Sequence, residues 1–157
     1  MRTDYDCIAA PSLARSFKPD QLLRPALTIE WARNEAQVRA AQCLRHAVFV
    51  TELGAHPAVC AHPTSPRHEC DYFDPFCDHL LIRAAPTFEH PEGILVGTCR
   101  VLRPAQAKLA GGLYSDTEFD LHALAPPRAS ALEMGRSCVH PDWRSGSVIM
   151  TMWRALG

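Results

Sequence analysis

The chain has 157 residues, of which 47% are hydrophobic, and its 16 Lys and Arg residues against 17 Asp and Glu residues give a net charge of −1. This composition predicts one compact domain, and the near-neutral charge excludes the basic excess on which nucleic-acid binding usually depends. The longest apolar runs fall far short of the roughly 20 residues of a spanning helix, so we expect no transmembrane segment.

The first 26 residues combine prolines and scattered charges with no sustained hydrophobic period, so we predict a flexible N-terminal arm over residues 1–26. They also lack the continuous apolar core of a secretory signal, which favours a cytoplasmic protein. The seven cysteines are odd in number and irregularly spaced, which favours reduced thiols. The domain itself is expected over residues 27–157.

A strand and a helix are predicted to open this domain. Apolar and polar residues alternate over 27–31, which is typical of a strand, and Asn34 followed three residues later by glutamine predicts a capped helix start. Apolar side chains at steps of three and four extend the helix to about Phe49. Arg45 and Phe49, which are four residues apart, share the face next to this apolar stripe. Residues 51–76 have no period, so we predict a long functional or mobile loop.

The second half of the chain contains three further strand candidates. Residues 78–84 and 94–102 are separated by prolines and a glycine and predict an antiparallel hairpin. Short helical turns are expected at 105–110, a strand at 131–139 and a helix at 148–156. This order predicts an α/β fold with a mostly antiparallel sheet flanked by helices.

Three charged residues lie within predicted strands. Arg100 shares a strand face with apolar residues and needs a carboxylate or a ligand anion beside it, unless its head reaches water at the sheet margin. Glu133 and Arg136 lie on opposite faces of a regular strand, unless a bulge near Gly135 turns them together. An internal ion pair and a catalytic role both remain open for these two residues.

Acidic residues recur at the end of the long loop, at Asp71, Asp74 and Asp78. They indicate either a solvated acidic loop or a pocket for a cationic substrate. Cysteines and histidines occur in the same stretch, but their spacing is atypical of zinc ligands, so we expect no metal.

Five ordered motifs resemble one enzyme family: LRHAVF at 44–49, DYFD at 71–74 with CDHL at 77–80, VGTCRVL at 96–102, YSDTEFDL at 114–121 and LEMGRSCV at 132–139. Together they resemble the L-ornithine N-alpha-acyltransferases, a hemolysin-like branch of the GNAT superfamily related to the acyl-homoserine lactone synthases. The likeness spans about residues 27–157 and implies a GNAT-like acyl-CoA N-acyltransferase fold. Such domains continue with further strands and helices, so we expect a C-terminally truncated member whose last strands are missing.

This resemblance implies transfer of a 3-hydroxyacyl group from acyl carrier protein to the α-amine of L-ornithine, which gives lyso-ornithine lipid. The thioester on the carrier is the co-substrate, and no bound cofactor is expected. We expect a cytoplasmic protein that can contact the inner membrane peripherally. The positions that match charged or aromatic residues typical of the lactone synthase relatives are Arg45, Phe49, Asp71, Asp74, Arg100, Glu133 and Arg136.

Amide formation requires a neutral amine, yet an α-ammonium with a pKa of roughly 8 is mostly protonated at neutral pH. Glu133 is therefore the predicted catalytic base, directly or through a water molecule. Arg100 and Arg136 are expected to bind the ornithine carboxylate or to order the acidic loop.

Asp71 and Asp74 are expected to accept the side-chain ammonium of ornithine or to fix Arg45. The turn that opens the last helix is predicted to bind the phosphate of the carrier's pantetheine arm through free N–H groups. It consists of Arg144, Ser145, Gly146 and Ser147. Because acyl carrier protein is acidic, the sequence also suggests a docking patch built from Arg103, Lys108, Arg144 and Arg154.

Two alternatives stay open. The first is a GNAT-like acyltransferase that uses acyl-CoA or another amine, similar to an acyl-homoserine lactone synthase. The second is a non-catalytic fragment or a zinc-stabilised domain.

Overall fold

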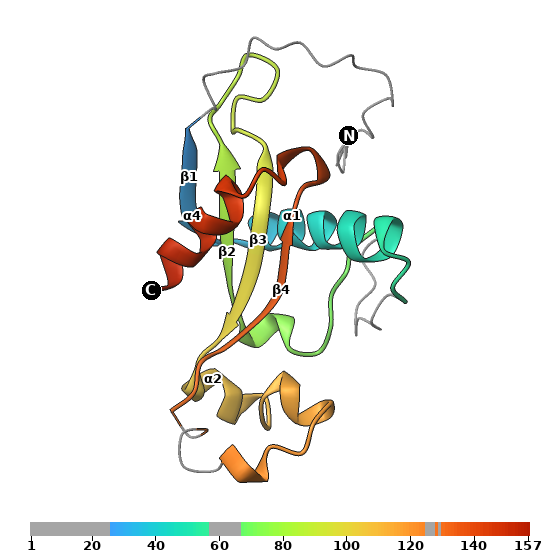
Figure 1. Cartoon of the computed structure of the whole chain (residues 1–157), viewed down its shortest axis with the longest axis vertical. Coiled ribbons are helices and arrows are strands. Elements are labelled where there is room, and N and C mark those ends of the chain that lie inside the picture. Colours follow the sequence, from blue (N-terminus) through green and yellow to red (C-terminus); the bar gives the residue numbers. More distant parts are fainter. Residues whose placement is uncertain (1–25, 57–66, 125–127, 129) are drawn as a thin grey trace.

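The computed structural model describes residues 26–56, 67–124, 128 and 130–157. The predicted arm lies outside this part, except for Ala26. Four strands form one antiparallel sheet in which spatial order follows chain order (Figure 1). They are β1 (Leu27–Trp31), β2 (Asp78–Ala84), β3 (Leu95–Leu102) and β4 (Glu133–Val139), which confirms the predicted strands to within two residues.

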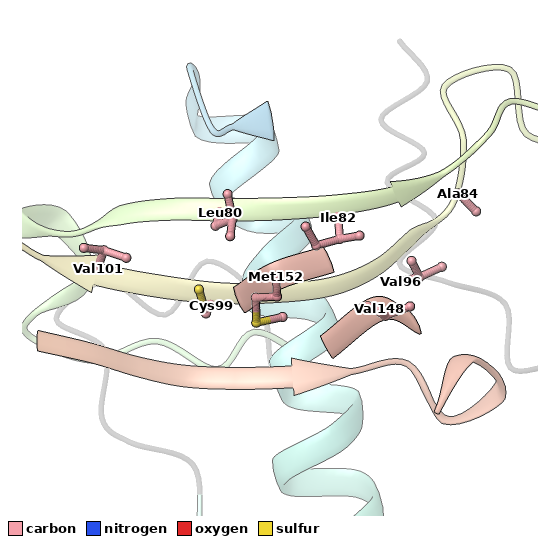
Figure 2. Packing of buried hydrophobic residues seen from close by; sticks show 8 residues of the cluster. All are labelled: Leu80, Ile82, Ala84, Val96, Cys99, Val101, Val148 and Met152. Atoms are coloured by element: carbon pink, nitrogen blue, oxygen red, sulfur yellow. The ribbon is translucent and has the colours of Figure 1, made fainter. Parts of the chain in front are cut away.

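Helices lie on both sides of this sheet. The helices are α1 (Glu35–Arg45), α2 (Pro104–Leu109) and α4 (Ser147–Leu156), accompanied by the short 3-10 segments η2 (Asp74–Phe76), η3 (Tyr114–Thr117), η4 (His122–Leu124) and η5 (Pro141–Trp143). Helix α4 and helix α1 pack on opposite faces of β2 and β3 (Figure 2). The predicted α/β fold with an antiparallel sheet and flanking helices is therefore confirmed.

Helix α1 begins as its sequence predicts. The side-chain oxygen of Asn34 accepts a hydrogen bond from the Gln37 N–H at 2.9 Å, and the Gln37 side chain accepts one from the Arg33 N–H at 2.7 Å. The sequence predicts one α-helix that ends near Phe49. The α-helix instead ends at Arg45, and the chain continues as a π-helical segment, η1 (His46–Glu52). Such π-helical turns occur frequently at functional sites.

The face of the sheet under α4 holds the larger apolar cluster. Its buried residues are Leu80, Ile82, Ala84, Val96, Cys99, Val101, Val148 and Met152 (Figure 2). Gly97 makes this close packing possible, because a Cβ atom at that position would lie 2.6 Å from Val148 Cγ1. The opposite face packs against α1 through Ala41, Leu44, Val48, Leu81, Leu95 and Cys138.

Strand β4 contains the predicted bulge. Thr98 pairs with Cys138 and Arg100 pairs with Gly135, so two steps along β3 correspond to three steps along β4. Arg136 lies within this irregularity and has a positive φ of 52°. A bulge leaves a residue out of the regular pairing and can redirect its side chain.

The expectation of reduced thiols is wrong for two cysteines. Cys43 and Cys70 are each disulfide-bonded, whereas Cys77, Cys99 and Cys138 are free. Spacing along the sequence does not reveal which thiols the fold brings next to another thiol. Among the described helices, none combines the length and the apolar character that crossing a bilayer requires.

Candidate active site

Charged side chains from three elements and one loop meet on the α1 side of the sheet. Three guanidinium groups come from α1, β3 and β4, and three carboxylates come from the loop before β2, at whose end η2 begins with Asp74. They are Arg45, Arg100 and Arg136 with Glu69, Asp71 and Asp74, and we call these six residues the ion-pair cluster. Its formal charges cancel.

Arg45 anchors α1 to the loop. Its side chain is 1% exposed, and its two terminal nitrogens lie 3.0 and 2.5 Å from the two carboxylate oxygens of Asp74. It also donates to the Glu69 carbonyl at 2.5 Å, and its Nε lies 2.7 Å from Glu69 Oε2. Burial alone would raise the pKa of Asp74, but the Arg45 and Arg100 guanidinium groups hold that pKa below its usual value.

Arg100 confirms the prediction that a carboxylate lies beside it. Its side chain is 3% exposed and donates to both Asp71 oxygens at 2.5 and 2.7 Å and to Asp74 at 2.8 Å. Burial would lower the pKa of Arg100, but these two carboxylates raise it. The guanidinium therefore stays charged inside the protein and orders the acidic loop.

Arg136 is the most exposed of the three arginines. Its side chain is 21% exposed, its Nε donates to Glu69 Oε1 at 2.9 Å and its Nη2 donates to Asp71 Oδ2 at 3.0 Å. The guanidinium also lies 4.8 Å from the ring centre of Tyr114, a cation–π distance. The bulge in β4 thus turns Arg136 towards the acidic loop.

Glu133 takes no part in these ion pairs. Its carboxylate accepts hydrogen bonds from the Tyr114 N–H at 2.7 Å, from the Ser115 N–H at 2.8 Å and from the Ser115 hydroxyl. It therefore holds the first residues of η3, while Arg136 binds other acids. The bulge does not pair Glu133 with Arg136, and the predicted role of Glu133 as a base stays a prediction.

A pocket of about 350 Å³ opens beside the ion-pair cluster. Its apolar lining includes Phe49, Val50 and Leu53 from η1 and the residue after it. Its polar lining includes Glu69, Arg136 and Ser137. Phe49 and Arg136 were predicted site residues, whereas Glu69 and Tyr114 were missed. The available signal for Glu69 was its place two residues before Asp71 in the acidic stretch.

The profile of the acetyltransferase (GNAT) domain family matches residues 44–154, which include the whole ion-pair cluster. The chain belongs to the GNAT family. This match confirms the expected GNAT fold.

Curated relatives of this GNAT chain are L-ornithine N(alpha)-acyltransferases. The relative from Rhodobacter capsulatus is 42% identical over 128 residues, which are 82% of this chain and 49% of that protein. The relative from Brucella abortus is 38% identical over 133 residues, or 82% and 46% of the two chains, and the relative from Agrobacterium fabrum is 37% identical over 125 residues, or 78% and 42%. The chain spans about half the length of the curated relatives it matches. No solved structure matches it significantly.

The turn before α4 enters the helix through a glycine in the left-handed conformation, without a side-chain cap hydrogen bond. Gly146 has a positive φ of 90°, Ser147 is the first helical residue, and the Ser145 and Ser147 hydroxyl oxygens lie 3.3 Å apart. Arg144 is bound to the Glu52 carboxylate through two hydrogen bonds of 2.5 and 2.6 Å. The turn's role in binding phosphate stays a prediction.

The four cations suggested as a carrier-docking patch divide between two regions. Arg103 and Lys108 belong to the start and the end of α2, whereas Arg144 and Arg154 belong to the turn before α4 and to α4 itself. Helix α2 lies beyond one end of the sheet, and α4 lies across one face of it (Figure 1). The four residues therefore do not form one continuous patch.

The described part of this GNAT chain shows neither a reactive thiolate among the free cysteines Cys77, Cys99 and Cys138 nor a metal-binding group of side chains. Burial raises the pKa of the Cys77 and Cys99 thiols to about 11 and that of Cys138 to about 12, so these thiols are neutral at pH 7. No group of three or more His, Cys, Asp or Glu side chains within the described residues is arranged to hold a metal ion.

Two of the cysteines and histidines in the stretch before β2, Cys60 and His62, lie outside the described residues.

Proposed function

We propose that this GNAT domain belongs to an L-ornithine N-alpha-acyltransferase, which moves a 3-hydroxyacyl group from acyl carrier protein to the α-amine of L-ornithine and gives lyso-ornithine lipid. The observation that carries the proposal is the 42% identity over 82% of this chain to a relative of that name. The pocket beside the ion-pair cluster offers a place for the reaction, because it combines apolar and charged walls. The proposal includes a cytoplasmic protein that contacts the inner membrane, where a lipid product would go.

The proposed reaction needs no bound cofactor, because the thioester already activates the acyl group. The α-nitrogen attacks the thioester carbonyl carbon, the new C–N bond forms, and the C–S bond breaks. The sulfur leaves as a thiolate and receives the proton that the base took from nitrogen. Backbone N–H groups at the bulge in β4 would stabilise the negative charge that develops on the carbonyl oxygen.

Glu133 is the proposed base in this scheme. A carboxylate offers about four acceptor positions, and Glu133 uses three of them for Tyr114 and Ser115. One position on Oε2 thus remains for a water molecule or the amine. These three donors hold the carboxylate in one position, three residues before the pocket-lining Arg136.

The other predicted residues support the substrates. Phe49 forms part of the pocket wall, and Arg45, Asp71 and Asp74 fix the loop that carries Glu69. The α4 turn is proposed to bind the carrier's pantetheine phosphate through its unpaired helix N–H groups. Acyl carrier protein would approach along this end of the molecule.

The proposal is tested by incubating the protein with 3-hydroxyacyl carrier protein and single amino acids, and by measuring the carrier thiol that is released. The 157-residue chain and any longer product of the same gene are tested side by side. Release that requires L-ornithine supports the proposal. Equal release with acyl-CoA or with unrelated amines indicates the broader GNAT alternative, and no release with any amine by either form contradicts enzymatic acyl transfer.

A further inference from the structure

We infer that Glu69 binds the side-chain ammonium of the acceptor amino acid and that Arg136 binds its carboxylate, so that the pocket selects a zwitterion with a cationic side chain. This inference rests on the proposed function and assigns the acceptor site to residues that line one pocket. It also moves the role of ammonium partner from Asp71 and Asp74 to Glu69.

Asp74 has no acceptor position left for a substrate. It accepts four hydrogen bonds: two from Arg45, one from Arg100 and one from the Gln42 side chain at 3.0 Å. These bonds use the roughly four acceptor positions of a carboxylate. Asp74 does not line the pocket, whereas Glu69, which is similarly buried, does.

Asp71 is saturated in the same way, whereas Glu69 is not. Asp71 accepts two hydrogen bonds from Arg100, one from Arg136 and one from the Phe73 N–H at 2.9 Å. Glu69 is also largely buried and its Oε2 is enclosed against Arg45 Nε, but its Oε1 accepts a single hydrogen bond, from Arg136, and so keeps one acceptor position. Of the three carboxylates in the cluster, Glu69 alone lines the pocket and keeps acceptor capacity.

The guanidinium groups divide by exposure. Arg45 and Arg100 are buried, while Arg136 is partly exposed and lines the pocket next to Glu69. A carboxylate can therefore approach Arg136 without unfolding the cluster. The apolar residues Phe49 and Val50 line the same pocket and suit the methylene groups that join the two charged ends of an amino acid.

The charge of the cluster fits the reacting form of such a substrate. Three guanidinium groups and three carboxylates already balance, and an added net charge would be costly in a partly buried site. A diamino acid whose α-amine is neutral carries one carboxylate and one side-chain ammonium. It therefore adds one charge of each sign and no net charge.

Calorimetry tests this assignment without catalysis. L-ornithine, L-norvaline, which lacks the side-chain amine, and 1,4-diaminobutane, which lacks the carboxylate, are titrated into the protein. We expect ornithine to bind about tenfold or more tightly than either analogue, since a hydrogen bond to a charged group contributes this much affinity. Equal affinity for ornithine and norvaline in the unaltered protein overturns the inference.

The decisive variant is Glu69→Gln, which keeps the shape of the side chain and removes its charge. We expect the ratio of norvaline Kd to ornithine Kd to fall to within about twofold, while the exposed control Glu35→Gln retains the full ratio. A merely structural Glu69 would weaken both ligands equally and leave the ratio unchanged, which contradicts the inference. If thermal melting shows that Glu69→Gln does not fold, the second variant described next supplies the test.

Ala55→Phe provides a variant that leaves every ion pair in place. Ala55 is exposed and lines the pocket, so a phenyl ring there should block it and abolish ornithine binding without lowering the melting temperature. Unchanged ornithine binding in Ala55→Phe places the ligand elsewhere and overturns the inference. The experiments also distinguish failure of the proposed function from failure of the pocket assignment. Selective ornithine binding without acyl transfer removes only the proposed function, and ornithine acylation with an unchanged Glu69→Gln ratio removes only the pocket assignment.

Discussion

Arg45 shows how one residue can join several parts of the site. It is almost completely buried and binds Asp74 and Glu69 at the same time. Replacing it with methionine fills similar space but leaves two buried carboxylates short of a partner. We predict that Arg45→Met lowers the free energy of unfolding by about 3–5 kcal/mol in urea titrations.

The matched control is Arg39→Met, nearly two turns earlier on α1, where the Arg39–Glu35 pair lies at the surface. This change should cost less than about 1 kcal/mol. Equal small effects of the two substitutions would show that the buried pair does not hold the cluster together.

Glu133 carries the catalytic prediction at the residue scale. Glu133→Gln keeps an acceptor for the η3 N–H groups but cannot take a proton. We expect the rate of acyl transfer to fall by about 10² to 10⁴ with little change in carrier affinity. Glu118→Gln, which alters a nearby carboxylate bound to the Tyr114 hydroxyl, should leave the rate within about twofold of the original. Undiminished turnover in Glu133→Gln removes this residue from the mechanism.

His79 provides a prediction on pH. Burial lowers its pKa below the ordinary value of 6.5, although Asp74 acts in the opposite direction. The unfolded chain therefore binds this proton more readily, so the stability that neutral His79 contributes is full above pH 6.5 and is lost as the pH falls through the folded-state pKa. We expect His79→Gln to lose less unfolding free energy than the unaltered protein when urea titrations are repeated below pH 6.5. Identical pH dependence in the two proteins would contradict this.

The sequence pointed to most of the cluster but not to its pairing. Arg100 and Arg136 could be selected because charged residues inside apolar strands require partners. Asp71 and Asp74 could be selected because acidic residues recur at the end of the loop, and Arg45 through the family resemblance. Which acid binds which arginine depends on the path of the loop before β2, and a loop without periodicity does not encode that path in any readable pattern. Glu69 was missed because it lies in this loop, where the neighbouring cysteines and histidines favoured other interpretations.

At the scale of elements, the packing of α4 on the sheet depends on one glycine. A methyl group on Gly97 would lie far inside contact distance of Val148. Gly97→Ala should therefore destabilise the protein by about 1–3 kcal/mol through overpacking, as measured by urea titration. Gly135→Ala on the neighbouring strand meets only an ordinary 3.8 Å contact and should be near neutral. A neutral Gly97→Ala would mean that α4 does not pack this closely.

The elements were largely predictable because their apolar periods are strong. Strands β1 to β4 and the start of α1 follow from alternation and from the Asn34 cap. The bulge near Gly135 could be proposed because glycine tolerates it. The π-helical η1 could not, since the apolar stripe of α1 continues to about Phe49 in an ordinary helical pattern that does not distinguish π-helical from α-helical turns.

At the scale of the whole molecule, the described sheet has β1 and β4 at its edges, and the pocket lies next to β4 through Arg136 and Ser137. The part of each relative that this chain matches is about half of that relative's length. The active unit that we propose is therefore tested both with this chain and with any longer gene product. The position of the acyl group in the product tests the proposed reaction and the proposed orientation of ornithine in the pocket together.

The most direct measurement uses L-ornithine labelled with ¹⁵N at the α-nitrogen. The protein is incubated with this substrate and 3-hydroxyacyl carrier protein, and tandem mass spectrometry locates the acyl group. Our account predicts an amide on the labelled nitrogen, with the unlabelled side-chain amine unmodified because Glu69 holds it as an ammonium. Acylation of the side-chain nitrogen, or no acylated ornithine from either form of the protein, would contradict it.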